Sequence, residues 1–345
     1  MRTTRCATRC TPRCTPSFVV RAFSAACLVV AASPVTADET CQSPYMRKNA
    51  GQEDYVYVWT LGVECLGDGS DKVVTVGANP EREDYGKVVS SVSVGGRHEA
   101  HHGGLTDDRR HLWLGGLDTS RIFIFDVASD PARPKLVKTI DDFPEKTGGV
   151  VGPHGFYALP GRMLIPALSN DDDWGGRTAV VEYSNDGEFI RTTWMPDDAP
   201  YGYDARVNAT LNRMLTSSFT GHRNYMRPLG ELMGDAEAMK EFGDSVVVWD
   251  FHARKPLQTL RIPGAPLEIR WALDPRNEYA FVEAALTGEL WGVFRKDDGR
   301  FEAQKVADIG PRDQQPLLAV DISISSDDKY LFVDTFMDGK VRVYD

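Results

Sequence analysis

The sequence predicts an all-β fold of the β-propeller class. Strand-like apolar runs recur about every 51 residues, and turns rich in Asp and Gly, such as Asn185–Gly187, separate them. Helical periodicity is nearly absent. A period near 50 residues with several strands in each unit is typical of propeller blades. The runs that define the repeat are His111–Leu117, Arg162–Leu168, Arg213–Phe219, Glu278–Ala284 and Lys329–Thr335.

A second strand is predicted after each of these runs, and a third in most units. One interval of the repeat is longer than the others, and it contains Leu229–Phe242, whose apolar residues fit a helical stripe. We therefore expect one blade to carry a helical insertion. The predicted second strands are Arg121–Val127, Thr178–Tyr183, Ser245–Asp250, Glu289–Phe294 and Lys340–Tyr344, and third strands include Lys135–Ile140 and Leu257–Ile262.

The repeat also predicts the number of blades. Residues Tyr55–Val94 supply a degenerate first unit, and five recognisable units follow. The sequence ends at Asp345, after the second visible strand of the last unit. We expect a single propeller domain over residues 38–345 with about six blades, the last incomplete. Because a propeller closes by joining its first and last blades, we expect either a C-terminally truncated chain or an unusual closure.

The N-terminus resembles an export signal. An Arg-bearing segment precedes the short apolar run Ala22–Ala32, and Val35–Ala37 resembles a small-residue cleavage site. We predict a signal peptide over residues 1–37 and a periplasmic or secreted mature protein, with an organellar transit peptide as the alternative. The apolar run is too short to span a bilayer, and no later stretch approaches that length.

Composition restricts the class of partner. The 345 residues are 42% hydrophobic, which is enough for a globular core. Without residues 1–37 the chain has 34 basic and 50 acidic groups and a net charge of −16. Such acidity argues against nucleic acid and anionic membranes as partners. Cys41 and Cys65 are the only cysteines after the predicted signal peptide. They either form a disulfide in an oxidising compartment or remain two free thiols.

One register of the repeat carries ionisable residues in five successive units. Applying the repeat spacing to His102 leads in turn to the positions of His154, Asp204, Glu268 and Asp321. Equivalent positions of a propeller surround its central channel, so these side chains are expected to converge. Each alone is explained as a turn cap, but five together favour a functional ring. Imidazoles with carboxylates suit copper or zinc.

The segment His98–His102 matches the H-E-x-x-H pattern of zinc peptidases. That chemistry needs a helix, whereas glycine pairs bracket the segment here and strands surround it, so the peptidase interpretation is disfavoured. In an extended strand His101 and His102 point to opposite faces. Both reach one metal only if Gly103 and Gly104 permit a bulge or loop. The isolated histidines His111, His222 and His252 are expected to be structural or solvated.

Several separated segments resemble the selenium-binding protein family, in particular its exported bacterial methanethiol oxidase branch. They span about residues 40–345. The segments are Cys41–Tyr45, His101–Gly104, Ser120–Val127, Gly202–Asp204, Pro266–Arg270 and Val320–Asp328. The resemblance implies a seven-bladed propeller and assigns the paired family histidines to His101 and His102 and the next one to His154. A further family histidine lies in a C-terminal region that this sequence lacks, and a Cys-Ser-Ser-Cys segment of some animal members is absent.

The resemblance also implies an activity. It is the copper-dependent conversion of methanethiol, oxygen and water to formaldehyde, hydrogen sulfide and hydrogen peroxide. We expect His101, His102 and His154 to hold the metal, which binds the thiolate. Glu268, Asp204 or Asp321 is expected to accept a proton, with their roles unassigned. The alternatives are a non-catalytic selenium- or metal-binding propeller and an inactive truncated homologue.

Overall fold

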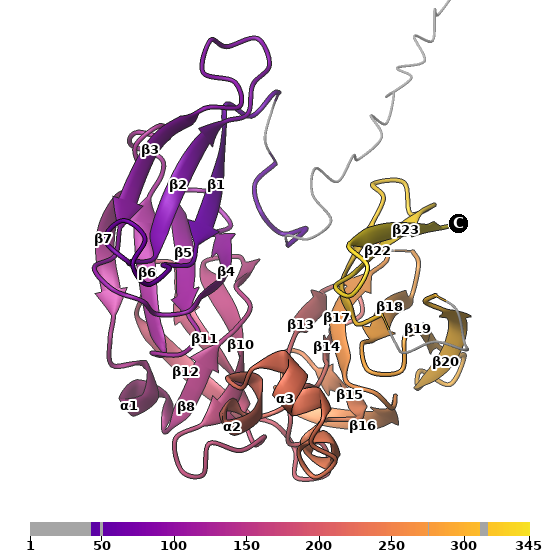
Figure 1. Cartoon of the computed structure of the whole chain (residues 1–345). Coiled ribbons are helices and arrows are strands. Elements are labelled where there is room, and N and C mark those ends of the chain that lie inside the picture. Colours follow the sequence, from indigo (N-terminus) through magenta and orange to yellow (C-terminus); the bar gives the residue numbers. More distant parts are fainter. Residues whose placement is uncertain (1–42, 49–50, 275, 311–316) are drawn as a thin grey trace, which may run out of the picture. The chain divides into compact units, whose positions relative to one another are not determined.

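The computed structural model describes residues 43–48, 51–274, 276–310 and 317–345. The predicted signal peptide and Cys41 lie outside the described residues. Within the described residues the strands form six antiparallel sheets, each a meander that follows the chain (Figure 1). This arrangement is a six-bladed propeller whose first and last sheets have three strands, which confirms the fold expected from the repeat.

The first three blades use strands β1 to β12. They are β1 (Tyr55–Thr60), β2 (Lys72–Gly77) and β3 (Val88–Ser93); β4 (Ala100–Leu105), β5 (His111–Gly116), β6 (Arg121–Asp126) and β7 (Lys135–Ile140); and β8 (Val150–Pro153), β9 (Tyr157–Leu159), β10 (Arg162–Asn170), β11 (Ala179–Ser184) and β12 (Phe189–Trp194). A short helix, α1 (Phe143–Thr147), joins the second blade to the third.

The last three blades use strands β13 to β23. They are β13 (Ala205–Asn208), β14 (Arg213–Thr216), β15 (Ser245–Asp250) and β16 (Lys255–Arg261); β17 (Pro266–Trp271), β18 (Tyr279–Ala284), β19 (Glu289–Arg295) and β20 (Phe301–Asp308); and β21 (Ala319–Ile324), β22 (Leu331–Thr335) and β23 (Lys340–Tyr344). The innermost strands of successive blades lie against one another, since β1 contacts β4, β13 contacts β17 and β17 contacts β21.

The helical insertion lies between β14 and β15, as predicted, but it is not one helix. It contains α2 (His222–Tyr225), α3 (Leu229–Met233) and the 3₁₀ helix η1 (Ala238–Glu241). Gly234 ends α3, and the Asp235 carboxylate then accepts the backbone N–H groups of Glu237 and Ala238, which starts a new turn. The predicted helical insertion is therefore present, and it is divided into three short helices. None of the described helices has the length and apolar character needed to cross a membrane.

The core lies between neighbouring blades. Strands in the middle of a blade are covered on both faces, so β6 (RIFIFD) and β15 (SVVVWD) are nearly continuous apolar runs rather than alternating ones. On the second blade, for example, Trp113 and Ile122 pack against Met163 of the third. The first sheet differs, because Val56 and Val58 of β1 are 49% and 43% exposed.

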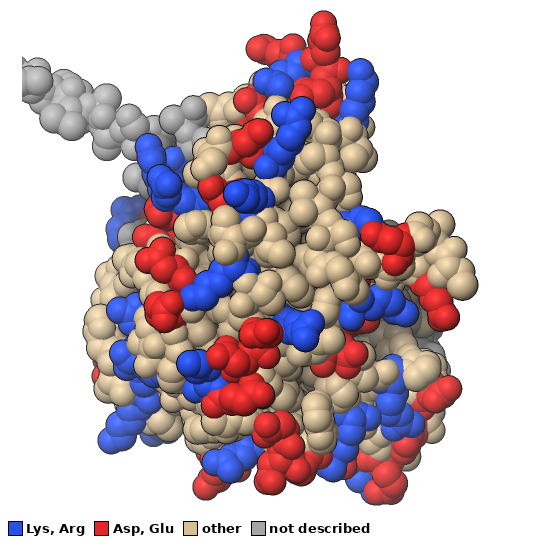
Figure 2. Space-filling model, turned by 90° about the vertical axis from the view of Figure 1, so that its left-hand side faces the viewer, with Lys and Arg blue, Asp and Glu red and all other residues tan. Residues whose placement is uncertain are grey.

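The outer strands of the blades carry charge. Figure 2 shows one face of the molecule, on which basic and acidic side chains are interspersed. Lys135 and Lys138 lie on β7, and Lys305 lies on β20. Charged side chains on an edge strand oppose pairing with the edge of another molecule. The blades therefore present protected outer edges, while their inner strands supply the functional residues.

Candidate metal centre

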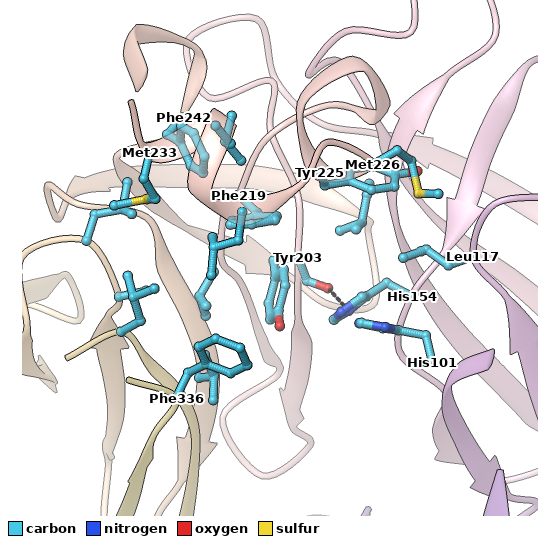
Figure 3. Close-up of a pocket in the computed structure, with 18 of the residues that line it drawn as sticks. His101, Leu117, His154, Tyr203, Phe219, Tyr225, Met226, Met233, Phe242 and Phe336 are labelled. Atoms are coloured by element: carbon cyan, nitrogen blue, oxygen red, sulfur yellow. Dashed lines mark hydrogen bonds between the residues drawn. The ribbon is translucent and has the colours of Figure 1, made fainter. Parts of the chain in front are cut away.

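Three histidines from two neighbouring blades meet in the structure. His101 and His102 lie on β4, and His154 follows β8. One nitrogen of each imidazole lies within 4.8 Å of the others, and the ring centroids are 4.5 to 5.0 Å apart. Figure 3 shows His101 beside His154 at the wall of a cavity. The structure thus brings together the three histidines that the repeat places at one register.

A bulge lets two consecutive residues face the same centre. The pairing of β4 with β5 shifts between Ala100, opposite Gly116, and Gly103, opposite Leu114, so His101 and His102 together occupy one position. Glu99, just before the bulge, has φ +62°, a conformation uncommon for a residue other than glycine. The bulge required by the sequence interpretation is therefore present, and it lies at the histidines themselves.

His154 is oriented by a backbone carbonyl. Its side chain is 1% exposed, and its Nδ1 lies 3.1 Å from the carbonyl oxygen of Tyr203. A carbonyl only accepts hydrogen bonds, so Nδ1 carries the proton and Nε2 keeps its lone pair. Nε2 is buried and has no hydrogen-bond partner within the described part of the chain. A buried unpaired nitrogen is costly unless it binds something, and a metal ion fulfils this need.

The surroundings keep the three imidazoles uncharged. Burial, together with the neighbouring His102, lowers the pKa of His101 to about 3. Burial also lowers the pKa of His102, and it lowers that of His154 well below the ordinary value, to which His102 and His101 contribute. Neutral imidazoles have the lone pairs that copper and zinc bind. The three residues therefore fit a borderline transition metal by charge, by spacing and by the orphaned nitrogen.

The H-E-x-x-H pattern does not form a peptidase site. His98 precedes β4 in irregular backbone, and its Nδ1 lies 2.9 Å from the Thr119 hydroxyl. It is buried against Phe123, with ring centroids 4.9 Å apart. Since the segment is not helical, His98 and His102 are not brought to one face by a helical turn. His98 is a packed structural residue, and the disfavoured interpretation is excluded by the fold.

The three predicted carboxylates meet two arginines that sequence reasoning missed. Asp204 accepts a bond from Arg206 at 2.7 Å, and Glu268 accepts bonds from Arg270 at 2.8 Å and Arg206 at 3.1 Å. Arg270 also donates to Asp321 at 2.7 Å. We call Asp204, Arg206, Glu268, Arg270 and Asp321 the ionic cluster. The signal that could have found the arginines is that each follows a ring carboxylate by two residues, on the same strand face.

The members of the ionic cluster differ in protonation and access. Asp204 and Glu268 are 4% and 5% exposed, whereas the Asp321 side chain is 46% exposed. Burial raises the pKa of Asp204 and that of Asp321 to about 6. Burial also opposes ionisation of Glu268, but Arg270 and Arg206 outweigh it and lower its pKa. Glu268 is therefore the firmly ionised member, and its charge favours positive charge on all three histidines.

A fourth carboxyl, Glu283 on β18, was also missed. It is fully buried, and its Oε1 accepts the backbone N–H of Glu268 at 3.0 Å. Its Oε2 has no hydrogen-bond partner within the described residues. Burial and the nearby Glu268 charge raise its pKa well above the ordinary value, so this group is a neutral acid. No sequence pattern distinguished it, because it sits one strand out from the predicted register.

An apolar cavity of about 260 Å³ adjoins the histidines. His101, His154 and Tyr203 form one part of its wall, and the insertion between β14 and β15 covers another (Figure 3). Apolar side chains dominate the wall, among them Phe219, Phe242, Leu267 and Leu318. Such a cavity holds a small apolar ligand next to the metal ligands. Elsewhere, Cys65 is an exposed free thiol in the described part of the chain, and Cys41, its candidate disulfide partner, lies outside that part.

The fold and the site together define a β-propeller with a three-histidine centre at the wall of an apolar cavity. The model of the 56 kDa selenium-binding protein family matches residues 35–345, and this chain belongs to that family. A methanethiol oxidase of Ruegeria pomeroyi is 56% identical over 90% of this chain and 74% of its own length. A methanethiol oxidase of Hyphomicrobium sp. is 52% identical over 90% of this chain and 71% of its own.

A solved structure agrees with this assignment. The hypothetical selenium-binding protein of Sulfolobus tokodaii superposes with a TM-score of 0.77 at 27% identity and covers 86% of this chain and 72% of its own. The family resemblance drawn from the sequence motifs is confirmed.

Proposed function

We propose that the protein is an exported, copper-dependent oxidase of methanethiol. The reaction consumes methanethiol, oxygen and water and yields formaldehyde, hydrogen sulfide and hydrogen peroxide. Two relatives more than half identical to the chain are named for this activity. The observation that carries the proposal is the set of three neutral imidazoles, one with a buried unpartnered Nε2, beside an apolar cavity.

His101, His102 and His154 would hold the metal. Copper bound there would supply Lewis acidity that lowers the thiol pKa and a route for electrons to oxygen. The Tyr203 carbonyl fixes the ring of His154 through its Nδ1–H. Glu268 supplies a nearby negative charge that favours a cation among the histidines. Arg206 and Arg270 hold that carboxylate ionised and in place.

In this proposal the cavity binds the substrate and the ionic cluster supplies the proton acceptor. Apolar side chains would bind the methyl group beside the three histidines. Asp204 is buried, and Arg206 and the backbone N–H groups of Ala205 and Ile269 occupy its oxygens, which leaves it without contact to solvent for exchanging a proton. Asp321 is half-exposed with a pKa of about 6, so it suits a proton acceptor in contact with solvent. Export rests on the Arg-bearing segment and apolar run of residues 1–37.

The test is an assay of the purified mature chain loaded with copper and supplied with methanethiol in a closed vial. We expect consumption of the headspace thiol with equal amounts of sulfide, formaldehyde and peroxide. The His154→Ala variant serves as the inactive reference. If the copper-loaded protein yields neither sulfide nor peroxide, the proposed activity is wrong. If zinc-loaded and copper-loaded protein turn over methanethiol equally fast, the proposed dependence on copper is wrong.

A second candidate is binding without turnover. A mouse relative that is 25% identical over 88% of this chain carries the name selenium-binding protein 2. The same histidines would then retain a metal or selenium species in the channel. This candidate predicts stoichiometric metal that depends on His154, with no thiol consumed under air.

A further inference from the structure

The insertion between β14 and β15 covers the cavity like a lid. Residues 217–244 connect these strands, whereas the equivalent connections of the second, fifth and sixth blades are the short segments 117–120, 285–288 and 336–339. We call residues 217–244 the lid. It contributes Phe219, Met226, Leu229, Leu232, Met233 and Phe242 to the cavity wall. One blade therefore carries an added segment whose apolar side chains face the predicted substrate.

The lid is fixed to the blades on the histidine side. The backbone N–H of His222 donates to the Ser169 hydroxyl at 3.2 Å, and its Nε2 lies 3.3 Å from the Asp118 carboxylate. Gly221 packs so closely on Gly175 that a Cβ at Gly221 would lie 2.2 Å from the Gly175 backbone. These contacts tie the lid to the second and third blades, which also supply the metal-binding histidines. The distance from the histidines to the lid is therefore set by packed structure.

The cavity is larger than methanethiol needs. One water molecule needs about 10–15 Å³ of such space, so the two heavy atoms of methanethiol occupy only a small part of the cavity of about 260 Å³. Figure 3 places Met233 and Phe242 across the cavity from His101 and His154, with Tyr203 and Phe219 between. A thiol whose sulfur lies at the histidines would extend its carbon chain along this apolar space.

The cavity also selects against charge. Glu99 is the carboxylate among the lining residues that the structure describes, and the lid adds apolar groups to the wall. Met226, Leu229 and Met233 are 36 to 40% exposed and form an apolar rim. Anionic thiols would lose hydration in such a space and would be repelled by Glu99. Uncharged thiols with short alkyl chains match the wall.

We propose that the lid makes the centre a site for uncharged alkyl thiols longer than methanethiol, with Met233 and Phe242 setting the upper limit of chain length. This inference rests on the proposed function, because it takes the histidines as the place of the sulfur. Each additional methylene buried against the wall contributes about 0.8 kcal/mol, which is about a fourfold gain in affinity. The gain ends when the chain reaches Met233 and Phe242.

Binding of volatile thiols to the metal-loaded mature protein tests the proposal. The protein is loaded with copper(I) and kept under nitrogen, so that neither oxygen nor copper(II) oxidises the thiol, and binding is measured from the loss of thiol in the headspace. We expect the dissociation constant to fall about fourfold per carbon over the first members of the series from methanethiol to hexanethiol, and to stop falling within the series. The anion 2-mercaptoethanesulfonate, followed by equilibrium dialysis, is expected not to bind.

Substitutions in the lid test whether Met233 and Phe242 set the upper limit on the chain length of the thiol. In Met233→Ala and Phe242→Ala we expect hexanethiol to bind about tenfold more tightly, while methanethiol changes less than twofold. The matched control is Met239→Ala, in the same lid but outside the cavity wall. If Phe242→Ala fails to fold, Met233→Ala still decides, because that side chain is 40% exposed. Equal affinity for all chain lengths, or a limit that Met233→Ala leaves unchanged, would overturn the proposal.

The two proposals fail in different ways. If thiols bind with the expected dependence on chain length but no peroxide forms under air, the proposed oxidase function is wrong and the lid inference stands. If methanethiol is oxidised but affinity ignores chain length and lid substitutions, the lid inference alone is wrong.

Discussion

The histidines and the ionic cluster occupy equivalent positions of successive blades, yet their polar atoms are in opposite states. In the ionic cluster, Glu268 and Asp204 accept bonds from arginines at 2.7 to 3.1 Å. Among the histidines, the Nε2 of His154 is buried and has no hydrogen-bond partner among the residues that the structure describes. One register of a repeat thus produces both an internally satisfied scaffold and a centre that needs a ligand. Unsatisfied buried atoms, more than the presence of ionisable residues, distinguish the site.

The largest expected effect comes from removing the unsatisfied nitrogen. His154→Ala deletes a ligand that no neighbouring side chain replaces, so metal retention should fall at least 100-fold. Elemental analysis after loading and dialysis measures it. The control is His252→Ala, whose imidazole is exposed. Full metal occupancy in His154→Ala would place the metal elsewhere.

Removing Arg270, a buried cation of the ionic cluster, should affect the stability of the fold rather than the choice of metal. Arg270→Ala leaves Glu268 and Asp321 without a shared partner in a buried setting, and we expect a loss of about 3–5 kcal/mol in the free energy of unfolding. Urea denaturation measures it. Arg276 pairs with Asp274 at the surface, so Arg276→Ala should cost less than about 1 kcal/mol. Equal effects of the two variants would mean that the ionic cluster is not a stabilising scaffold.

Removing the charge of Glu268, which lies near the histidines but is not itself a proposed ligand, should have an intermediate effect on metal affinity. Glu268→Gln removes the ionised carboxylate that favours a cation, and metal affinity should fall about 10-fold. Glu283→Gln is the matched control, because that buried acid is already neutral. Competition with a chelator measures both affinities. If the two variants bind metal equally well, Glu268 exerts no electrostatic effect at the centre.

The smallest expected effect is confined to acidic pH. Asp321 has a pKa of about 6, so it accepts protons above that pH and is protonated as the pH falls below it. The kcat/KM of the parent enzyme should therefore decline below about pH 6, by about tenfold per unit. Asp321→Asn should be slower at neutral pH but lack this acid limb, whereas Asp327→Asn, at an exposed carboxylate, should keep it. An unchanged acid limb in Asp321→Asn would remove it from the reaction.

The fold was predictable because the repeat is visible in the apolar runs, and the observed strands begin within a few residues of the predicted ones. The ring of His102, His154, Asp204, Glu268 and Asp321 followed from one spacing. The features that the sequence did not predict depend on three-dimensional contacts. The bridging role of Arg270 depends on the contact between neighbouring blades, which brings Asp321 beside the Glu268–Arg270 pair. Helix α3 of the insertion ends at Gly234, and the insertion forms part of the cavity wall. Both features depend on tertiary packing, which cannot be inferred from a helical stripe of apolar residues.

The bulge in β4 has a consequence for how such centres arise. Neighbouring strand residues normally diverge, and a pair of ligands is expected two positions apart. Here a single extra residue brings adjacent imidazoles together while the ladder resumes at Gly103. Deleting one of the two would restore a regular strand and leave the blade intact, yet the centre would lose a donor. On this scaffold the insertion or deletion of one codon can therefore add or remove a donor without a new fold.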